Sequence, residues 1–409
     1  MVNTLNEKNS TFVLFFTKVI LIMRRLAVVA FGGNALLKSG QKGTVDEQEA
    51  NAYAASKNLV KLLNRRYNLV LTHGNGPQVG NILMANSAGY KSYDIPDMPL
   101  DISVAYSQGF IGYMLEQQLR NVLMENDMDR DIISIITQVL VNKDDPAFEN
   151  PTKPIGPYFS KEEADIFIKE SGSVFKEDKA RGGWRKVVAS PEPLVIFNMR
   201  SIEKIANDGH IAIAVGGGGI PCYYKKENKL QGIDAVIDKD LASSLLASQI
   251  HAHKLFILTD VPKVFLNYNT PQEKSLDRLS IAEAKQYLKD GQFSSGSMGP
   301  KIQAAINFVV RSGKDAIITA PELLGVDNGG TRITIVSLKI RCCCALGFSL
   351  NNLICSSFIF HFHIEGHLLK SSYHIIFFKI YTFRNLYRFG SVVQDAFNAR
   401  FNKLFCCSH

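Results

Sequence analysis

The sequence predicts an α/β protein with a mostly parallel sheet and one small inserted subdomain. Short apolar runs of strand length alternate with segments that have helical spacing, which is typical of crossover units. A proline-rich stretch, residues 142–192, interrupts this alternation. Glycine-rich turns follow several of the strands, and ligands of open parallel sheets bind at such turns.

Each expected element follows from its own residues. The strands are short apolar or β-branched runs, and the helices repeat apolar residues every three to four positions beside charged faces. The expected strands are 26–31, 69–72, 132–137, 211–215, 255–259 and 316–319, and the expected helices are 46–65, 103–124, 241–250 and 302–311. The stretch 142–192 holds clustered prolines, many charges and the single tryptophan, so we interpret it as an insert into the domain 24–333.

Charge argues against a nucleic-acid partner. The chain of 409 residues has a formal net charge of +8, but residues 334–409 contain eight Lys or Arg and only two acids. The body, residues 24–333, is therefore close to neutral and lacks the basic patch that nucleic-acid binding requires.

Cysteine usage indicates a reducing compartment. Cys222 is the only cysteine of 24–333, and the other six follow residue 334. One cysteine is no disulfide framework, so we predict a cytoplasmic protein. The run Cys342–Cys344 lacks the paired spacing of zinc ligands, and we expect no metal site there.

The two ends differ from the body. Residues 11–23 are apolar but too short to span a bilayer, so we interpret 1–23 as an extension without function, with a signal or anchor peptide as the alternative. Residues 334–409 hold 11 of the 25 phenylalanines without helical or strand periodicity, and we expect a disordered or aberrant tail. The uncharged stretch 342–360 leaves a tail anchor as an alternative, although we do not expect a membrane partner.

Four glycine-rich turns are candidates for phosphate binding. Glycine lets backbone amides approach an anion, and a helix that starts directly afterwards adds its positive end. The turns are Gly32-Gly33-Asn34, Gly74-Asn75-Gly76, Gly216–Gly219 and Gly296–Gly299. The sequence has neither the P-loop motif nor a G-x-G-x-x-G followed by an acid, which argues against a P-loop kinase and a nicotinamide dehydrogenase.

Lysines beside these turns suit phosphoryl transfer, which needs positive charge around the transferring group. Lys239 and Lys301 lie at predicted helix N-termini, where a cation opposes the helix dipole, so stability alone does not explain them. Lys143 lies at the entrance to the insert. Asp240 is placed to orient two of the amines, and its alternative role is a helix cap.

An ordered set of motifs resembles carbamate kinase of the amino-acid-kinase superfamily. The motifs are AFGGNA (30–35), HGNGPQVGN (73–81), SQGFIGYM (107–114), NPTKPIG (150–156), GGGGIP (216–221), DAVIDKDLASSLLA (234–247), LTDV (258–261) and GSMGPKIQAAI (296–306). Close relatives in the superfamily carry Lys after the first double glycine, whereas this chain has Asn34, as carbamate kinases do. A lysine of the insert replaces it in those enzymes, and Lys143 matches that role.

The resemblance implies a three-layer α/β/α sandwich with about eight strands, a homodimer, and phosphoryl transfer between carbamoyl phosphate and ADP in arginine catabolism. It assigns carbamate or carbamoyl phosphate to Gly32, Gly33, Asn34, Gly74, Asn75 and Gly76. It assigns ADP or ATP to Gly217, Gly218, Thr259, Asp260 and Met298, with Mg²⁺ held mainly by the nucleotide phosphates. Catalysis falls to Lys143, Lys239, Asp240 and Lys301. Two alternatives remain open, namely a kinase for another small acid and a non-catalytic nucleotide-binding protein.

Overall fold

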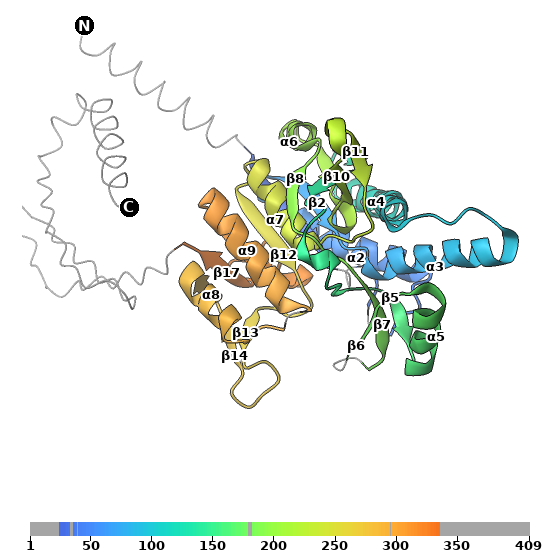
Figure 1. Cartoon of the computed structure of the whole chain (residues 1–409). Coiled ribbons are helices and arrows are strands. Elements are labelled where there is room, and N and C mark those ends of the chain that lie inside the picture. Colours follow the sequence, from blue (N-terminus) through green and yellow to red (C-terminus); the bar gives the residue numbers. More distant parts are fainter. Residues whose placement is uncertain (1–23, 33–35, 39, 179–181, 295, 336–409) are drawn as a thin grey trace, which may run out of the picture. The chain divides into compact units, whose positions relative to one another are not determined.

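An eight-stranded sheet forms the centre of the described part of the chain (Figure 1). The computed structural model describes residues 24–32, 36–38, 40–178, 182–294 and 296–335. The strand order is β15 (Arg278–Ser280), β17 (Thr331–Thr334), β16 (Ala316–Thr319), β12 (Lys254–Leu258), β1 (Arg25–Phe31), β2 (Tyr67–His73), β9 (Ile211–Ile213) and β3 (Ile132–Ser134). All neighbours run parallel except β16 and β17, which confirms the predicted mostly parallel sheet.

Helices cover both faces of this sheet because its central strands are apolar on both sides. In β1, Ala27 and Val29 belong to one buried cluster with α2 (Val45–Asn64) and α4 (Leu100–Glu125). Leu26 and Val28 belong to another cluster with α7 (Lys239–Gln249) and α9 (Met298–Ser312). Since neighbouring residues of a strand point to opposite faces, this division produces three layers and confirms the α/β/α sandwich.

The helix starts are encoded locally. Thr44 before α2, Ser160 before α5 (Lys161–Ser171) and Ser280 before α8 (Ile281–Lys289) each form a capping box with a glutamate three residues later. At α7, Asp238 caps the backbone amides of Asp240 and Leu241. Each cap sets where its helix begins, and the cap of α7 belongs to the site described below.

The segment between β4 (Gln138–Val141) and β8 (Pro193–Ile196) contains a separate small sheet. Its strands lie in the order β5 (Lys153–Phe159), β7 (Trp184–Val188) and β6 (Phe175–Glu177). The rings of Phe159, Phe167 and Phe175 pack with centroids 5.2 to 6.0 Å apart and join α5 to this sheet. We call residues 142–192 the inserted subdomain; it lies against α3 (Gly76–Tyr93) (Figure 1).

The remaining elements surround these layers. A four-stranded sheet has the order β11 (Leu230–Gly232), β10 (Ile220–Tyr224), β4 and β8, and β13 (Val264–Leu266) pairs with β14 (Lys274–Leu276). Helix α6 is Met199–Asn207, and 3-10 turns occur at Pro146–Phe148, Gly216–Gly218, Lys226–Asn228 and Pro321–Leu323. No helix within the described ranges is long and apolar enough to cross a membrane.

Both predicted extensions lie mostly outside the part of the chain that the structure describes. Residues 1–23 and 336–409 lie outside the described residues, as do Gly33 and Asn34. By contacts the chain divides into 1–337 and 338–409, and the described residues all belong to the first unit.

Candidate active site

Three of the four predicted turns lie at one edge of the sheet, while the fourth, Gly296–Gly299, leads into α9. Gly32 follows β1, Gly74 follows β2, the Gly216–Gly218 turn follows β9, and Thr259 follows β12. These four strands are adjacent and parallel, so their carboxyl ends lie at the same edge. This is the edge where open α/β sheets bind ligands.

The turns after β2 and β9 touch each other so closely that they leave no room for side chains. A Cβ placed on Gly216 would lie 2.4 Å from Nε2 of His73, and one placed on Gly217 would lie 2.2 Å from Nδ2 of Asn75. Gly217 also has a φ of 64°, which glycine adopts without strain. The structure thus brings Asn75, a predicted substrate residue, against Gly217, a predicted nucleotide residue.

A buried glutamine of α4 holds the glycine turn. The Gln108 amide donates to the carbonyl of Gly216 at 2.9 Å, and its side-chain oxygen accepts from the Thr137 backbone N–H at 2.8 Å. The Thr137 hydroxyl in turn accepts from the Val215 N–H at 3.1 Å. Val215 has a φ of 55°, which is unfavourable for a β-branched residue, so these bonds stabilise a strained entry into the turn.

Two lysines share one buried carboxylate at the starts of α7 and α9. The Lys301 amine donates to Oδ2 of Asp240 at 2.9 Å, and the Lys239 amine donates to Oδ1 of the same group. The Asp240 side chain is 4 % exposed, and the two lysine side chains are 10 % and 12 % exposed. The structure therefore brings together three of the four predicted catalytic residues.

Burial and charge act on this cluster in opposite directions. Burial would raise the pKa of Asp240, but the attraction of Lys239 and Lys301 outweighs it and lowers that pKa. Burial likewise opposes the charge of Lys301, yet Asp240, Asp238 and Asp260 raise its pKa. The pKa of Lys239 is lowered, because its own burial and the nearby Lys301 together exceed the attraction of Asp240.

A further lysine joins this cluster from the inserted subdomain. The Lys153 amine donates to Oδ2 of Asp238 at 2.5 Å, and Oδ1 of Asp238 caps the N-terminus of α7. Both side chains are largely buried, with exposed fractions of 26 % and 14 %. Sequence reasoning missed Lys153, although it belongs to the quoted NPTKPIG segment. Lys153 begins β5 and is followed by Pro154, so it offers no helix-terminus signal.

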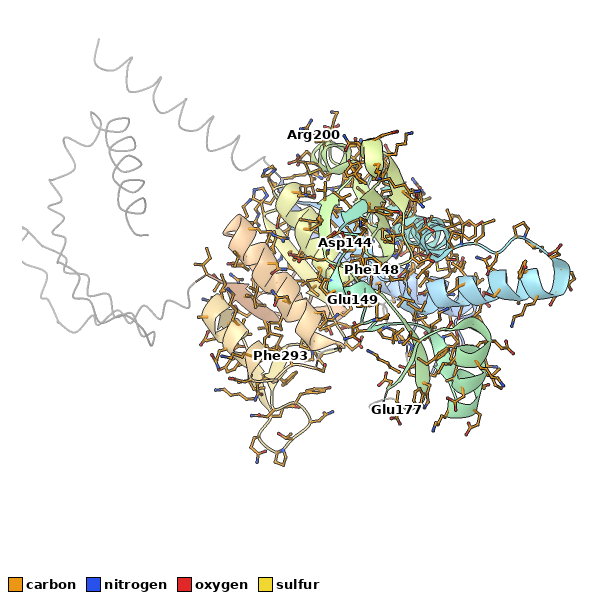
Figure 2. All side chains as sticks on the ribbon, in the orientation of Figure 1. Asp144, Phe148, Glu149, Glu177, Arg200 and Phe293 are labelled. Carbon is orange, nitrogen blue, oxygen red and sulfur yellow. The ribbon has the colours of Figure 1, made fainter. Side chains whose placement is uncertain are left out.

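Lys143 is not brought to the cluster. Its amine pairs with Asp144 at 2.8 Å, and the exposed fractions of the two side chains are 56 % and 72 % (Asp144 is labelled in Figure 2). Lys143 follows β4, whereas Lys153 begins β5, and only Lys153 contacts the α7 cap. The geometry therefore favours Lys153 over Lys143 as the lysine that the insert contributes.

His73 is a buried base at the centre of these contacts. It is 1 % exposed, and burial lowers its pKa to about 4, with a further contribution from Lys239. One ring nitrogen, Nδ1, lies 3.0 Å from the carbonyl oxygen of Gly74. The ring is therefore neutral at pH 7 and supports the turn as an uncharged group.

The other predicted residues lie around the same edge. Gly76 begins α3 and approaches the Pro154 carbonyl, beside Lys153. A Cβ on Gly218 would lie 2.3 Å from the carbonyl oxygen of Ile237, next to Asp238. Asp260 is exposed and acts electrostatically on Lys301, while Met298 is half-buried at the start of α9. For Gly33 and Asn34, outside the described residues, the assignments stay predictions.

The fold and this edge define a class of protein. A sheet with helices on both faces carries glycine turns and buried lysines at its carboxyl edge. The sequence model of the amino acid kinase family matches residues 25–320, which is most of the described chain. The chain belongs to the amino acid kinase family.

Its relatives narrow the class to the carbamate kinases. The chain is 46% identical over 296 residues to carbamate kinase of Pyrococcus horikoshii, which covers 72% of this chain and 94% of the relative. It is 47% identical over 318 residues to carbamate kinase 2 of Staphylococcus aureus, covering 76% and 99%. A solved carbamate kinase from Giardia lamblia bound to citric acid is 40% identical, with a TM-score of 0.72 and coverage of 76% and 99%.

Proposed function

We propose that this chain is a carbamate kinase that transfers a phosphoryl group reversibly between carbamoyl phosphate and ADP. A β-phosphate oxygen of ADP attacks the phosphorus of carbamoyl phosphate, and the bond from phosphorus to the carbamoyl oxygen breaks. ATP forms and carbamate leaves. The observation that carries the proposal is the convergence of Lys153, Lys239 and Lys301 on Asp238 and Asp240 beside the glycine turns.

The three lysines supply positive charge where the transferring group is most negative. Buried ammonium groups held by carboxylates need little reorganisation when the phosphoryl moves between oxygens. Asp240 fixes the spacing of Lys239 and Lys301, while Asp238 fixes Lys153 relative to α7. Backbone amides of the turns at Gly32 and Gly74–Gly76 are assigned to carbamoyl phosphate, together with Gly33 and Asn34.

The nucleotide is assigned to the half of the edge formed by β12 and α9. Thr259 and Asp260 follow β12, Met298 begins α9, and Gly217 and Gly218 face the junction with the other half. A Giardia lamblia carbamate kinase that is 42% identical has been solved bound to AMP-PNP, which supports a nucleotide site in this fold.

Magnesium fits this site as an ion carried by the nucleotide. Within the described ranges no three His, Cys, Asp or Glu side chains are grouped to hold a metal, and Asp238 and Asp240 are engaged by lysines. We therefore propose that Mg²⁺ is held mainly by the phosphates of ADP or ATP, where it neutralises part of their charge.

A homodimer is supported by an exposed stripe on α4. Ile102, Tyr106, Phe110 and Tyr113 are 36 to 64 % exposed and recur every three or four residues, so they share one face of the helix. Exposed aromatic residues are typical of interfaces.

We expect sedimentation to show a dimer for the full chain and a monomer for the double variant Tyr106→Glu/Phe110→Glu. Tyr268→Glu, which changes an exposed tyrosine of the loop between β13 and β14, serves as the control. A monomeric unmodified chain would refute the dimer.

The setting we propose is arginine breakdown in the cytoplasm, where the enzyme makes ATP. Carbamoyl phosphate is a high-energy donor, so transfer to ADP is the favoured direction. Cys222 is a buried free thiol, and burial raises its pKa to about 11, which suits a protein kept without disulfides. ATP yield from carbamoyl phosphate in a cytosolic fraction tests the setting, and activity found only with membranes or medium would oppose it.

The test of the activity is ATP formation from ADP and carbamoyl phosphate by the full-length chain. Lys301→Ala is expected to lower kcat by about a hundredfold or more, the scale of losing one preorganised charge. Lys285→Ala, an exposed lysine of α8, is the matched control and is expected to keep full activity. ATP formed from aspartyl or glutamyl phosphate but not from carbamoyl phosphate would replace this function with that of another small-acid kinase. Nucleotide binding without any turnover would indicate a non-catalytic protein.

A further inference from the structure

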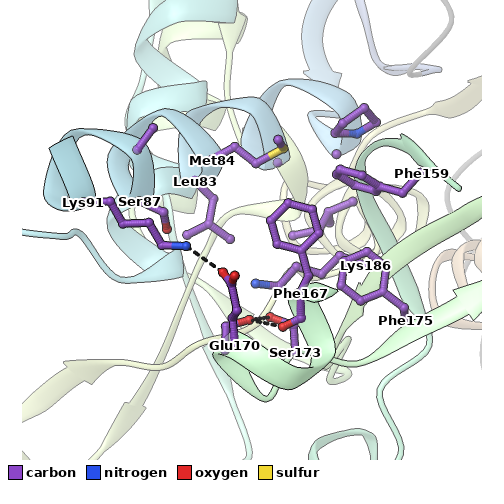
Figure 3. A pocket seen from close by; sticks show the side chains of 16 residues that line it. Leu83, Met84, Ser87, Lys91, Phe159, Phe167, Glu170, Ser173, Phe175 and Lys186 are labelled. Carbon is purple, nitrogen blue, oxygen red and sulfur yellow. Dashed lines mark hydrogen bonds and ion pairs between the residues drawn. The ribbon is translucent and has the colours of Figure 1, made fainter. Parts of the chain in front are cut away.

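A cavity of about 300 Å³ lies between α3 and the inserted subdomain (Figure 3). Its walls are mostly apolar and come from both sides. They are Leu83 and Met84 of α3, Ile155 and Phe159 of β5, Phe167 of α5, and Phe175 of β6. A cavity of this size is at the lower end for small-molecule sites, which are usually apolar with a few polar groups.

One cation points into this apolar space. The Lys186 side chain of β7 reaches between α3 and α5, and its amine has no hydrogen-bond or ion-pair partner among the described residues (Figure 3). Burial lowers the pKa of Lys186, although Asp234 and Asp97 act in the opposite direction from beyond ion-pair distance. A half-buried ammonium without a partner gains from a bound anion.

The neighbouring charges do not supply that anion. Glu170, which also lines the cavity, is held at 2.8 Å by the amine of Lys91. Both side chains are more than half exposed, so this pair closes the outer rim. Lys186 therefore supplies the interior charge that faces the aromatic walls of the cavity. A polyphosphate carries several negative charges, so a single cation among aromatic rings does not suit it.

We propose that this cavity binds a small carboxylic acid with an aromatic or branched apolar body. The carboxylate is held by the Lys186 amine and the body packs against Phe159, Phe167 and Phe175. Apolar contact favours the body, since burying it removes apolar surface from water. The charge-assisted hydrogen bond fixes its orientation.

The two walls of the cavity continue into the active site. Helix α3 begins at Gly76 beside the phosphate turns, and β5 begins with Lys153 before it lines the cavity. Between the two ends, Gly80 of α3 packs directly on Gly156 of β5. An acid wedged between these walls therefore biases the position of Lys153 relative to Asp238. This consequence for turnover rests on the proposed function, whereas binding does not.

Binding is tested by calorimetric titration of the full-length chain with 3-phenylpropanoate and with its neutral counterpart 3-phenylpropanamide. We expect the acid to bind with a Kd of about 1 mM or tighter, and the amide to bind about tenfold more weakly. Lys186→Met should abolish this difference, while Lys169→Met, an exposed lysine of α5, should keep it. Ala88→Phe, which adds a ring at the cavity, should weaken both ligands, and saturating ADP should not displace the acid, because the two sites are separate.

Two results would overturn the site. One is equal binding of acid and amide, and the other is unaltered acid binding by Lys186→Met. Turnover is measured separately as ATP formation with and without the acid, and we expect a change of about fivefold or more that Lys186→Met lacks. Binding with unchanged turnover would overturn the coupling to Lys153. A chain without kinase activity would refute the proposed function, while the titrations would still decide the site.

Discussion

Asp238 joins Lys153 of the inserted subdomain to the first turn of α7, with one carboxylate oxygen on each. The same carboxylate thus caps a helix of the sandwich and binds an amine that arrives 85 positions away in sequence. Burial would raise the pKa of Asp238, but the attraction and hydrogen bond of Lys153, together with the charge of Lys239, outweigh it and lower that pKa. The position of the subdomain is therefore linked electrostatically to the helix that carries Lys239 and Asp240.

Lys153 and Lys143 make a matched pair of substitutions within one segment. Lys153→Met is expected to lower kcat for ATP formation by about a hundredfold, because it removes a partly buried charge next to the cluster. Lys143→Met is expected to stay within about twofold of the unmodified chain, since exposed ion pairs contribute little. Steady-state kinetics decide the matter; a large loss in Lys143→Met with normal activity in Lys153→Met would restore the prediction made from sequence.

Gln108 is predicted to act as a positioning residue for the glycine turn. Gln108→Met keeps the length of the side chain but leaves the Thr137 N–H and the Gly216 carbonyl without this partner. We expect a loss of about 2 to 4 kcal/mol in unfolding free energy, together with a kcat decrease of about tenfold. Gln118→Met changes another buried glutamine of α4 in the same way, so it shows what the loss of a buried polar group costs without affecting the glycine turn. A variant with the stability loss and unchanged kcat and KM would reduce Gln108 to a structural role.

His73 predicts a loss of stability in mild acid. Its folded pKa is about 4 against an ordinary value of 6.5, so the unfolded chain binds more protons between these values. The contribution of His73 is complete above pH 6.5 and falls as pH decreases toward 4. Between pH 7 and pH 5 this amounts to about 2 kcal/mol. Urea unfolding of the unmodified chain and of His73→Asn at both pH values measures it, and equal pH dependence in the two chains would disprove the assignment.

The contact between Gly80 and Gly156 predicts that alanine substitutions at two glycines of α3 change the unfolding free energy differently. A Cβ on Gly80 would lie 2.1 Å from the Cα of Gly156, and this neighbour is a backbone atom that cannot rotate away as a side chain can. Gly80→Ala is expected to cost about 1 to 3 kcal/mol of unfolding free energy. Gly89→Ala, whose Cβ would meet only the Ile95 side chain at 3.7 Å, is expected to be neutral or to add up to about 1 kcal/mol. Chemical denaturation compares them, and equal stability of the two variants would contradict the close contact.

The sheet was largely predictable because its strands carry their own signal. The runs that form β1, β2, β12 and β16 are apolar on both faces, and glycine turns mark where β1 and β2 end. Helix α3 gave no such signal, since only Gln78, Val79 and Gly80 of its 18 residues are buried. A helix that faces mostly solvent lacks the apolar periodicity on which sequence reasoning depends.

Within the site, local sequence patterns predicted Lys239 and Lys301 but not the contact between Lys153 and Asp238, which are distant in sequence. Lys239 and Lys301 were predictable because each lies at a helix start that glycine or aspartate marks. The pairing of Lys153 with Asp238 depends on how the inserted subdomain packs on the sandwich, and no spacing in the sequence encodes it. Gln108 was likewise missed, because a glutamine in the middle of a helix gives no sign of the turn that it holds.

Two carboxylates offset two of the three ammonium groups at the carboxyl edge of the sheet. Seen from a distance the edge is nearly uncharged, so it draws anions only weakly through solvent that contains salt. The lysine amines attract an anion strongly only when the anion is in direct contact with them. The rate at which carbamoyl phosphate is captured should then change little with ionic strength, and selection among passing anions takes place after arrival, by fit.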